Sequence, residues 1–250
     1  MKRTLFVFLM LIFVPLTQAA SGFETIVAKI KPSVVGVGIS DPMGSPRNVL
    51  QGTGFAVGDG TLIVTNFHVV EKALDPESYQ QRVVFIGIGE SPKISPAEII
   101  KTDPGHDLAI LKIKDSVPPL TLADDTYLPD GRDVAFTGFP IGAILGLYPA
   151  THRGMIAALT PVVIPSANAQ QLSIQMMKRL KEPFMVYQMD ATAYPGNSGS
   201  PVYDVESGKV VALINKVFVK ETKESALSAP SGISYSIPVK YLHALMAELE

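Results

Sequence analysis

The segment Tyr-Pro-Gly-Asn-Ser-Gly-Ser-Pro-Val, residues 194–202, sets serines among glycines and prolines. Such residues collect in surface turns, because they supply unusual dihedrals or local side-chain hydrogen bonds. A nucleophile loop needs the same residues, because glycine lets backbone N–H groups approach a reacting oxygen. The local composition fits both interpretations. The choice therefore depends on whether the chain also supplies a base and an orienting acid for one serine, Ser198.

The chain has four histidines that could serve as that base: His68, His106, His152 and His243. His243 falls in an expected terminal helix, and His152 has no carboxylate near it in the sequence. His106 adjoins Asp107, but neighbours on extended backbone point to opposite faces. His68 ends an apolar hairpin that begins at Gly52, so it is the candidate base, although a lone histidine is more often structural.

Asp107 is the candidate acid, because it directly precedes the apolar run Leu108–Ile113. A carboxylate at the start of a strand can be partly buried and fixed, as an orienting acid must be. The alternative is a turn or capping aspartate, a role that Asp103 beside Pro104 already fills. The order is then histidine, aspartate, serine. This differs from the α/β-hydrolase order, whose nucleophile motif also requires glycine at the position of Ser200.

Short Val- and Ile-rich runs, separated by Gly, Pro, Asp and Ser, predict two groups of strands and hence an all-β sandwich or barrel architecture. The first group is Val34–Ile39, Gly54–Val57, Leu62–Thr65, Val83–Ile88, Ile99–Lys101 and Leu108–Ile113. The second group is Asp133–Gly138, Thr151–Leu159, Phe184–Asp190, Ser200–Tyr203, Val210–Phe218 and Gly232–Ile237. Residues 114–132 carry three prolines and predict a crossover between two domains.

Three segments predict helices rather than strands. Phe23–Ile30 is a short candidate that closes at Pro32, and Val239–Leu249 repeats leucine and methionine at helical spacing. Ala167–Lys181 is either an amphipathic helix or an ordinary surface helix or loop. The predicted organisation is a barrel over 21–120, a second barrel over 121–238 and a helix over 239–250.

The first twenty residues predict a secretory signal peptide. A basic start is followed by the apolar run Leu5–Val14 and by the small residues Ala19 and Ala20. The apolar run is well short of the roughly 20 residues of a spanning helix, although an uncleaved anchor is the alternative. The chain has no cysteine, which excludes disulfides and thiolate chemistry, and an exported chain without disulfides favours a bacterial envelope. A net charge of −2 gives no basic footprint for nucleic acid.

Three segments together resemble the trypsin-like serine proteases of the HtrA/Deg type. They are Thr65-Asn-Phe-His-Val-Val, His106-Asp-Leu-Ala-Ile-Leu-Lys-Ile and Pro195-Gly-Asn-Ser-Gly-Ser-Pro. Thr137-Gly-Phe-Pro-Ile-Gly, Gln188-Met-Asp-Ala and Ser234-Tyr-Ser-Ile-Pro are looser matches. The resemblance implies two six-stranded antiparallel β-barrels of the chymotrypsin type with a C-terminal helix. It also leads us to expect no PDZ domain, because the chain ends where that domain usually begins.

The resemblance implies the site residue by residue. Ser198 would be the nucleophile, His68 the base and Asp107 the acid that orients it, and the N–H groups of Gly196 and Ser198 would form the oxyanion hole. Thr192, Leu213 and Ile214 would line the specificity pocket. Glutamate-selective relatives share the Ser200 variant but carry a histidine in the strand matching 210–216, where this chain has none. We therefore expect a small or apolar residue before the cleaved bond.

The expected function is that of an exported endopeptidase, periplasmic or secreted, that acts on unfolded or processed envelope polypeptides. The sequence predicts no cofactor, no metal site, no nucleic-acid partner and no spanning segment once the signal is removed. A catalytically idle barrel used as a scaffold or binding module remains an alternative, as does an esterase with the same triad. The oligomeric state, the natural substrate and the role of the 167–181 segment stay open.

Overall fold

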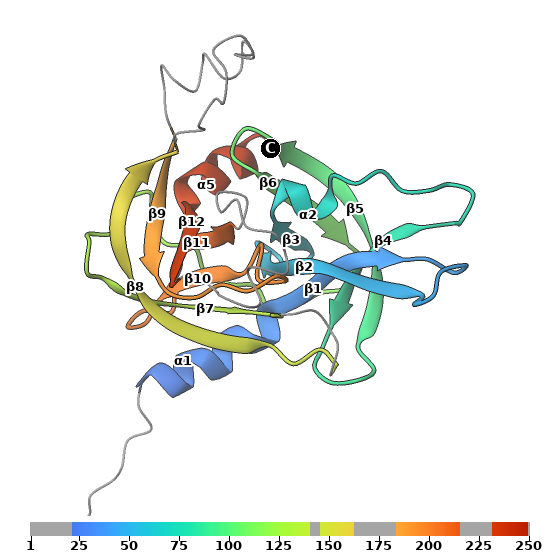
Figure 1. Ribbon diagram of the computed structural model, residues 1–250, viewed down its shortest axis with the longest axis horizontal. Coiled ribbons are helices and arrows are strands. Elements are labelled where there is room, and N and C mark those ends of the chain that lie inside the picture. Colours follow the sequence, from blue (N-terminus) through green and yellow to red (C-terminus); the bar gives the residue numbers. More distant parts are fainter. Residues whose placement is uncertain (1–21, 141–145, 163–183, 216–231, 250) are drawn as a thin grey trace, which may run out of the picture.

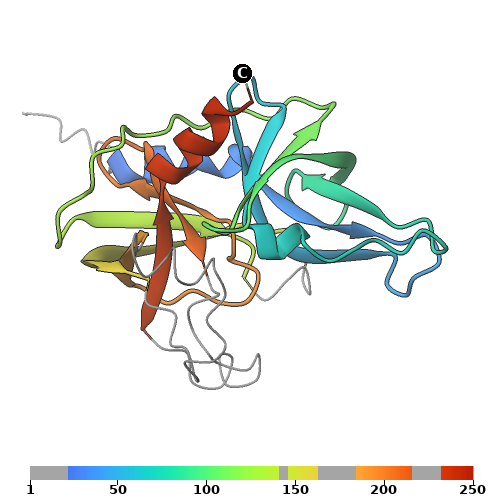
Figure 2. The same ribbon diagram turned by 90° about the horizontal axis from the view of Figure 1, so that it is seen from above.

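The computed structural model describes residues 22–140, 146–162, 184–215 and 232–249. Within these ranges the chain forms two barrels side by side, with a helix at each end of the described chain (Figures 1 and 2). The predicted signal peptide and the candidate helix Ala167–Lys181 lie outside the described residues. None of the helices described is long and apolar enough to cross a membrane.

The first barrel closes in the strand order β1-β2-β3-β6-β5-β4, with every neighbouring pair antiparallel. Its strands are β1 (Val34–Ser40), β2 (Asn48–Val57), β3 (Leu62–Thr65), β4 (Gln81–Ile86), β5 (Lys93–Asp103) and β6 (Leu108–Ile113). A short helix, α2 (Phe67–Val70), follows β3. This helix is absent from the sequence-based prediction, which treats the segment as the end of a hairpin.

The second barrel closes in the order β10-β11-β12-β9-β8-β7, again with antiparallel neighbours. Its strands are β7 (Asp133–Gly138), β8 (Ala150–Pro161), β9 (Met185–Asp190), β10 (Pro201–Asp204), β11 (Val210–Asn215) and β12 (Ile233–Pro238). The predicted fold class, two six-stranded barrels with a C-terminal helix, is thereby confirmed.

The strand ends differ most from the prediction at β5. The expected run Ile99–Lys101 is only the centre of a strand that extends from Lys93 to Asp103. Its outer residues include Pro96 and Glu98, both exposed, so the apolar pattern that marks a strand is interrupted. A register shift between Ile99 and Lys101 also breaks the regular alternation of buried and exposed side chains.

One apolar cluster joins the two barrels. It contains Phe55 and Leu108 from the first barrel together with Tyr203 and Leu213 from the second, all fully buried. Each barrel also has a cluster of its own. The interface between the barrels is therefore packed like a domain core, which keeps residues from different barrels at fixed positions.

The two helices at the ends of the described chain reinforce that interface. Helix α5 (Val239–Ala247) buries Leu242 and Leu245 and contacts β11 and β12 of its own barrel and β5 of the other. Helix α1 (Gly22–Ile30) precedes the first barrel but reaches the second, where the Arg153 guanidinium lies 5.4 Å from the centre of the Phe23 ring. A 3₁₀ turn over Lys31–Ser33 links α1 to β1.

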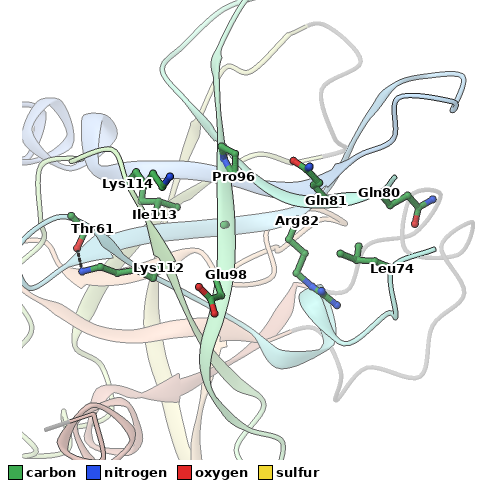
Figure 3. A pocket seen from close by; sticks show the side chains of 11 residues that line it. Thr61, Leu74, Gln80, Gln81, Arg82, Pro96, Glu98, Lys112, Ile113 and Lys114 are labelled. Atoms are coloured by element: carbon green, nitrogen blue, oxygen red, sulfur yellow. Dashed lines mark hydrogen bonds between the residues drawn. The ribbon is translucent and has the colours of Figure 1, made fainter. Parts of the chain in front are cut away.

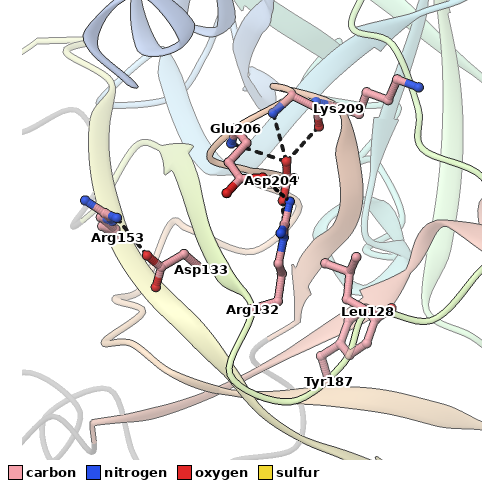
Figure 4. A network of polar contacts seen from close by, with 9 residues as sticks. Leu128, Arg132, Asp133, Arg153, Tyr187, Asp204, Glu206 and Lys209 are labelled. Atoms are coloured by element: carbon pink, nitrogen blue, oxygen red, sulfur yellow. Dashed lines mark hydrogen bonds and ion pairs between the residues drawn. The ribbon is translucent and has the colours of Figure 1, made fainter. Parts of the chain in front are cut away.

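A buried carboxylate closes the turn after β10 (Figure 4). Asp204 Oδ2 accepts a hydrogen bond from Arg132 Nε at 2.6 Å, and Oδ1 accepts from the backbone N–H and the hydroxyl of Ser207, both at 2.8 Å. Burial opposes ionisation of Asp204, but the Arg132 guanidinium and the Ser207 donors hold its pKa below the ordinary value. The ionised form is therefore the one that stabilises the fold.

We expect Asp204→Asn to lower the free energy of unfolding by about 1–3 kcal/mol at neutral pH, because charge-assisted hydrogen bonds are lost. A carboxyl whose pKa is lower in the folded state stabilises above its unfolded pKa, so the difference from wild type should shrink below about pH 4. Urea unfolding at several pH values measures this.

Asp133→Asn is the matched control, because Asp133 pairs with Arg153 at 2.7 Å while both side chains are more than half exposed. Exposed pairs contribute little, so this variant should unfold like wild type. Equal effects of the two substitutions would contradict the role given to Asp204.

Candidate active site

His68 and Asp107 are joined by two hydrogen bonds. Asp107 Oδ2 lies 2.7 Å from His68 Nδ1, and Asp107 Oδ1 accepts from the backbone N–H of His68 at 2.8 Å. Both side chains are mostly buried: that of His68 is 27% exposed and that of Asp107 is 15% exposed. A carboxylate on Nδ1 makes that nitrogen the donor, which leaves Nε2 as the nitrogen able to accept a proton.

Asp107 also caps the helix that carries His68. The first N–H groups of a helix lack partners within it. Here the Asp107 carbonyl accepts from Phe67 N at 3.2 Å, and the carboxylate accepts from His68 N. The Asn66 side chain adds a bond from Nδ2 to the same carbonyl at 3.1 Å. The backbone of Asp107 has φ = +54°, a left-handed conformation uncommon for a residue other than glycine and a form of strain that clusters at functional sites.

Ser198 follows a tight turn over residues 194–197. Asn197 N donates to Tyr194 O at 3.0 Å, Pro195 occupies the second position and Gly196 has φ = +98°. Proline second and a positive φ third define a type II turn, which requires glycine at the third position. The N–H groups of Gly196 and Ser198 donate to no acceptor among the described residues, whereas that of Asn197 is used within the turn.

The helix that carries His68 and the turn that precedes Ser198 come from different barrels, but both approach Gly52. A Cβ added at Gly52, on β2, would lie 2.7 Å from the Val69 side chain and 3.1 Å from the Ser198 carbonyl oxygen. Val69 directly follows His68 in α2. Among the described residues no hydrogen bond joins the Ser198 hydroxyl to His68. The fold therefore brings the three predicted residues into one region without completing the serine–histidine contact.

The side chain of Ser200 is accommodated by a glycine on β7, Gly138. Ser200 is fully buried, and a Cβ added at Gly138 would lie only 1.9 Å from its hydroxyl oxygen. Asn197 Oδ1 and Thr53 Oγ1 would both lie 3.0 Å from the same added atom. The space that a side chain at 138 would need is thus occupied by the hydroxyl of Ser200.

The family description of the trypsin-like peptidase domain matches residues 52–213, a range that holds His68, Asp107 and Ser198. The chain belongs to this family. Among its relatives, a protein named as a probable periplasmic DegP-like serine endoprotease from Chlamydia muridarum is 31% identical over 198 residues, 79% of this chain and 33% of the relative. One of the same name from Halomonas elongata is 28% identical over 189 residues, 75% of this chain and 32% of the relative.

This trypsin-like chain thus spans about a third of the length of these relatives. Among solved structures, the HtrA-type protease AlgW with a tripeptide matches with a TM-score of 0.66 at 22% identity, over 91% of this chain and 63% of AlgW. Deg5 matches with a TM-score of 0.63 at 24% identity, over 89% of this chain and 91% of Deg5. At 22–24% sequence identity, these structural matches show that the chain shares the fold of these proteins.

The residues expected in the specificity pocket of this trypsin-like domain do not share one environment. Thr192 is partly exposed on the loop before the turn. Leu213 and Ile214 are both fully buried, but Leu213 packs in the cluster that joins the barrels and Ile214 in the cluster of the second barrel. Neighbouring strand residues point to opposite faces, which accounts for the separation.

The other histidines have structural partners. His106 Nδ1 lies 2.5 Å from Asp103 Oδ2, and its ring stacks on Tyr241 of α5 at 4.4 Å. The hydrogen bond from His106 lowers the pKa of Asp103 despite partial burial. Asp103 also accepts from His106 N, which confirms its role as the turn aspartate. His243 Nδ1 lies 2.6 Å from Asp125 Oδ1.

His152 is the remaining histidine, and it lies on β8 near the turn. Its ring stacks on Phe136 with centroids 4.9 Å apart and lies 5.9 Å from the ring of Tyr194. Burial lowers its pKa, so the neutral imidazole is favoured there.

A cavity of about 830 Å³ lies away from these residues, on the first barrel (Figure 3). Arg82 and Lys112 line it, but the Arg82 guanidinium is already bound to the carbonyls of Val70 and Lys72, and Lys112 contacts Thr61. In the described part of the chain, no three His, Cys, Asp or Glu side chains gather as a metal site would require.

We expect Gly138→Ala to destabilise the protein by about 1–3 kcal/mol, because the added methyl overlaps the Ser200 hydroxyl in a packed interior. Ser200→Gly removes the overlapping atom, so the double variant Gly138→Ala/Ser200→Gly should regain much of the loss. Thermal unfolding of the four proteins forms a double-mutant cycle. Additive effects of the two substitutions would contradict the steric coupling.

Proposed function

We propose that this chain is a serine endopeptidase that hydrolyses peptide bonds through an acyl-enzyme. The observation that carries the proposal is the doubly hydrogen-bonded Asp107–His68 pair beside the Ser198 turn. An aspartate that holds a histidine by Nδ1 and by its backbone has the geometry of an orienting acid. Family membership supports the same chemistry.

In the proposed reaction the Ser198 hydroxyl attacks the scissile carbonyl and its proton passes to His68 Nε2. The C–N bond then breaks as the imidazolium returns that proton to the departing amine, which leaves the serine acylated. Water attacks the acyl-enzyme next, with His68 taking its proton and giving it back to Ser198. Throughout, the Asp107 carboxylate keeps the proton on Nδ1 and stabilises the transient cation.

The N–H groups of Gly196 and Ser198 are proposed to bind the oxyanion of each tetrahedral intermediate. Both lack a protein acceptor among the described residues, and they flank an N–H that the turn itself uses. Donors fixed in advance are worth more than donors that must reorganise, and one such donor typically contributes ~3–4 kcal/mol to the transition state. The type II turn supplies that fixed orientation.

The proposed substrates are polypeptides, with a small or apolar residue before the cleaved bond. Thr192 is uncharged, and so are residues 210–215 of β11, whereas Lys216, the last residue of the matching stretch 210–216, lies outside the described residues. We further propose export to a bacterial envelope, in protein quality control or processing. The names of the relatives, which call them periplasmic endoproteases, and the basic-apolar pattern of residues 1–20 support this.

A second candidate is a catalytically idle trypsin-like domain that serves as a binding module. The observation that favours it is the missing hydrogen bond between the Ser198 hydroxyl and His68 in the described structure. General-base catalysis needs that contact in the reacting complex, although apo enzymes often form it only with substrate bound. A reactivity measurement separates the two candidates.

We expect a fluorophosphonate probe to label the protein, and peptide mass spectrometry to map the label to Ser198. Ser198→Ala should abolish labelling, because the nucleophile is gone. His68→Ala should slow it by orders of magnitude. Asp107→Asn should slow it by about 10⁴-fold, because the altered partner favours the wrong imidazole tautomer.

Circular dichroism and thermal unfolding of each variant check that the fold persists, and Ser91→Ala, at an exposed serine of the first barrel, is a control that should label like wild type. Labelling that survives in Ser198→Ala would overturn the assignment of the nucleophile. A folded wild type that is inert even with unfolded protein present would favour the idle module.

The substrate preference is tested on an unfolded protein such as reduced and alkylated lactalbumin. We expect cleavage after residues such as Ala, Val and Leu, because neither Thr192 nor residues 210–215 of β11 offer an ion pair to a charged side chain. Mass spectrometry of the fragments gives the cleavage sites, and Ser198→Ala removes background proteolysis from the comparison. Cleavage mainly after Glu, Arg or Lys would contradict the preference.

A further inference from the structure

Thr53 lies on β2 of the first barrel, where it pairs with Gly36 of β1, and its side chain is fully buried. A buried hydroxyl is costly unless it is hydrogen-bonded, so its partners show what it holds. The partners of Thr53 belong to three separate segments of the chain. One of these segments is the turn that carries Ser198.

Four hydrogen bonds radiate from this one residue. The Thr53 hydroxyl donates to the Gly196 carbonyl at 2.7 Å and accepts from the backbone N–H of Phe139 at 3.1 Å. The Thr53 N–H donates to the Ser198 carbonyl at 2.9 Å. The Thr53 carbonyl accepts from the Thr65 hydroxyl at 2.7 Å, on the strand that leads to His68.

The Gly196 carbonyl belongs to the peptide that lies between the two proposed oxyanion donors. Along the chain, Gly196 N precedes this peptide and Ser198 N follows it. The turn holds the N–H of this peptide, since Asn197 N donates to Tyr194 O, and Thr53 holds its carbonyl. Together the two bonds fix the ψ of Gly196 and the φ of Asn197. Since glycine is the residue with the widest choice of backbone conformations, this is the place in the turn where an external constraint matters most.

We propose that Thr53 is a positioning residue, whose hydroxyl holds the Gly196 carbonyl so that the N–H groups of Gly196 and Ser198 converge on the oxyanion. The inference rests on the proposed function and assigns a residue of the first barrel to the oxyanion hole of the second. The hydrogen bond from the backbone N–H of Thr53 to the Ser198 carbonyl would form with most residues at position 53. The hydroxyl is the part that depends on the sequence.

Loss of the hydroxyl leaves the half-buried Gly196 carbonyl and the buried Phe139 N–H without this partner. A carbonyl that loses its hydrogen bond favours rotation of its peptide toward another donor. Rotation of this peptide turns the neighbouring N–H groups away from a common point, so transition-state stabilisation is lost while the apolar packing stays. The expected effect is thus on the rate of acylation rather than on substrate binding.

The test compares Thr53→Val, Thr53→Ser and Thr137→Val by the rate of fluorophosphonate labelling at Ser198. Valine keeps the shape of threonine without the hydroxyl, and serine keeps the hydroxyl without the methyl group. Thr137 is also fully buried, and its hydroxyl bonds Thr151 and Tyr203 rather than the turn. Thr137→Val therefore controls for the loss of stability that removal of any buried hydroxyl would cause.

We expect Thr53→Val to lower the maximal labelling rate by about 10- to 100-fold, less than the roughly 10²- to 10³-fold found for loss of an oxyanion donor, because both donors remain and only their orientation changes. The probe concentration for half-maximal rate should not change. Thr53→Ser and Thr137→Val should react within about threefold of wild type. Wild-type reactivity of Thr53→Val, or equal losses in the valine and serine variants, would overturn the role of the hydroxyl.

Hydrogen–deuterium exchange of the peptide covering residues 194–200 tests the anchoring without any activity. The amides of Asn197, Gly199 and Ser200 are hydrogen-bonded in the folded turn and should exchange slowly. They should exchange faster in Thr53→Val, or in Thr53→Ala if valine does not fold, but not in Thr53→Ser. Unchanged exchange would overturn the inference. If the wild type did not react with the probe but the variants showed the expected exchange differences, the proposed function would be contradicted while the role of Thr53 in holding the turn would stand.

Discussion

The site depends on a single carboxylate, that of Asp107, which satisfies two demands at once. Its oxygens accept hydrogen bonds from the imidazole and from the backbone N–H of His68, while its backbone carbonyl accepts from the N–H of Phe67, the first of α2. Because both ends of His68, backbone and ring, are tied to the same residue, the histidine cannot shift without breaking the helix cap. The left-handed backbone of Asp107 is maintained by these contacts, which illustrates how local strain is retained when its surroundings over-determine it.

The second constraint is that the site is divided between barrels. Asp107 and His68 belong to the first, whereas Ser198 follows a turn of the second. A site of this kind works only if the barrels have one relative position. The shared apolar cluster provides that position, α5 contacts strands of both barrels, and Thr53 adds directional bonds across the boundary. Apolar packing sets the distance between the two barrels, and the hydrogen bonds of Thr53 set the orientation of the turn that precedes Ser198.

The sequence predicts the architecture well because the strand runs are short, apolar and bounded by turn residues, so that β3, β6 and β7 have the predicted ends. It misses α2, since four residues carry no helical period and the helix exists through its cap at Asp107. The three triad candidates could be named from motif and order. Thr53 could not, because a threonine between two glycines in a strand carries no sign of the turn that lies more than 140 positions away.

The two proposed functions differ in a narrow structural respect. The backbone positions of the three candidate residues are fixed by contacts already made: the cap on α2, the type II turn and the bonds to Thr53. The contact that the described structure lacks is the one between the Ser198 hydroxyl and His68, and this hydroxyl turns about one side-chain bond. A scaffold that had lost catalysis would have no need for a carboxylate on His68 Nδ1, or for the two N–H groups that have no acceptor in the described part of the chain. Their retention together is more simply explained by a site in which the last hydrogen bond forms when a substrate carbonyl arrives at the turn.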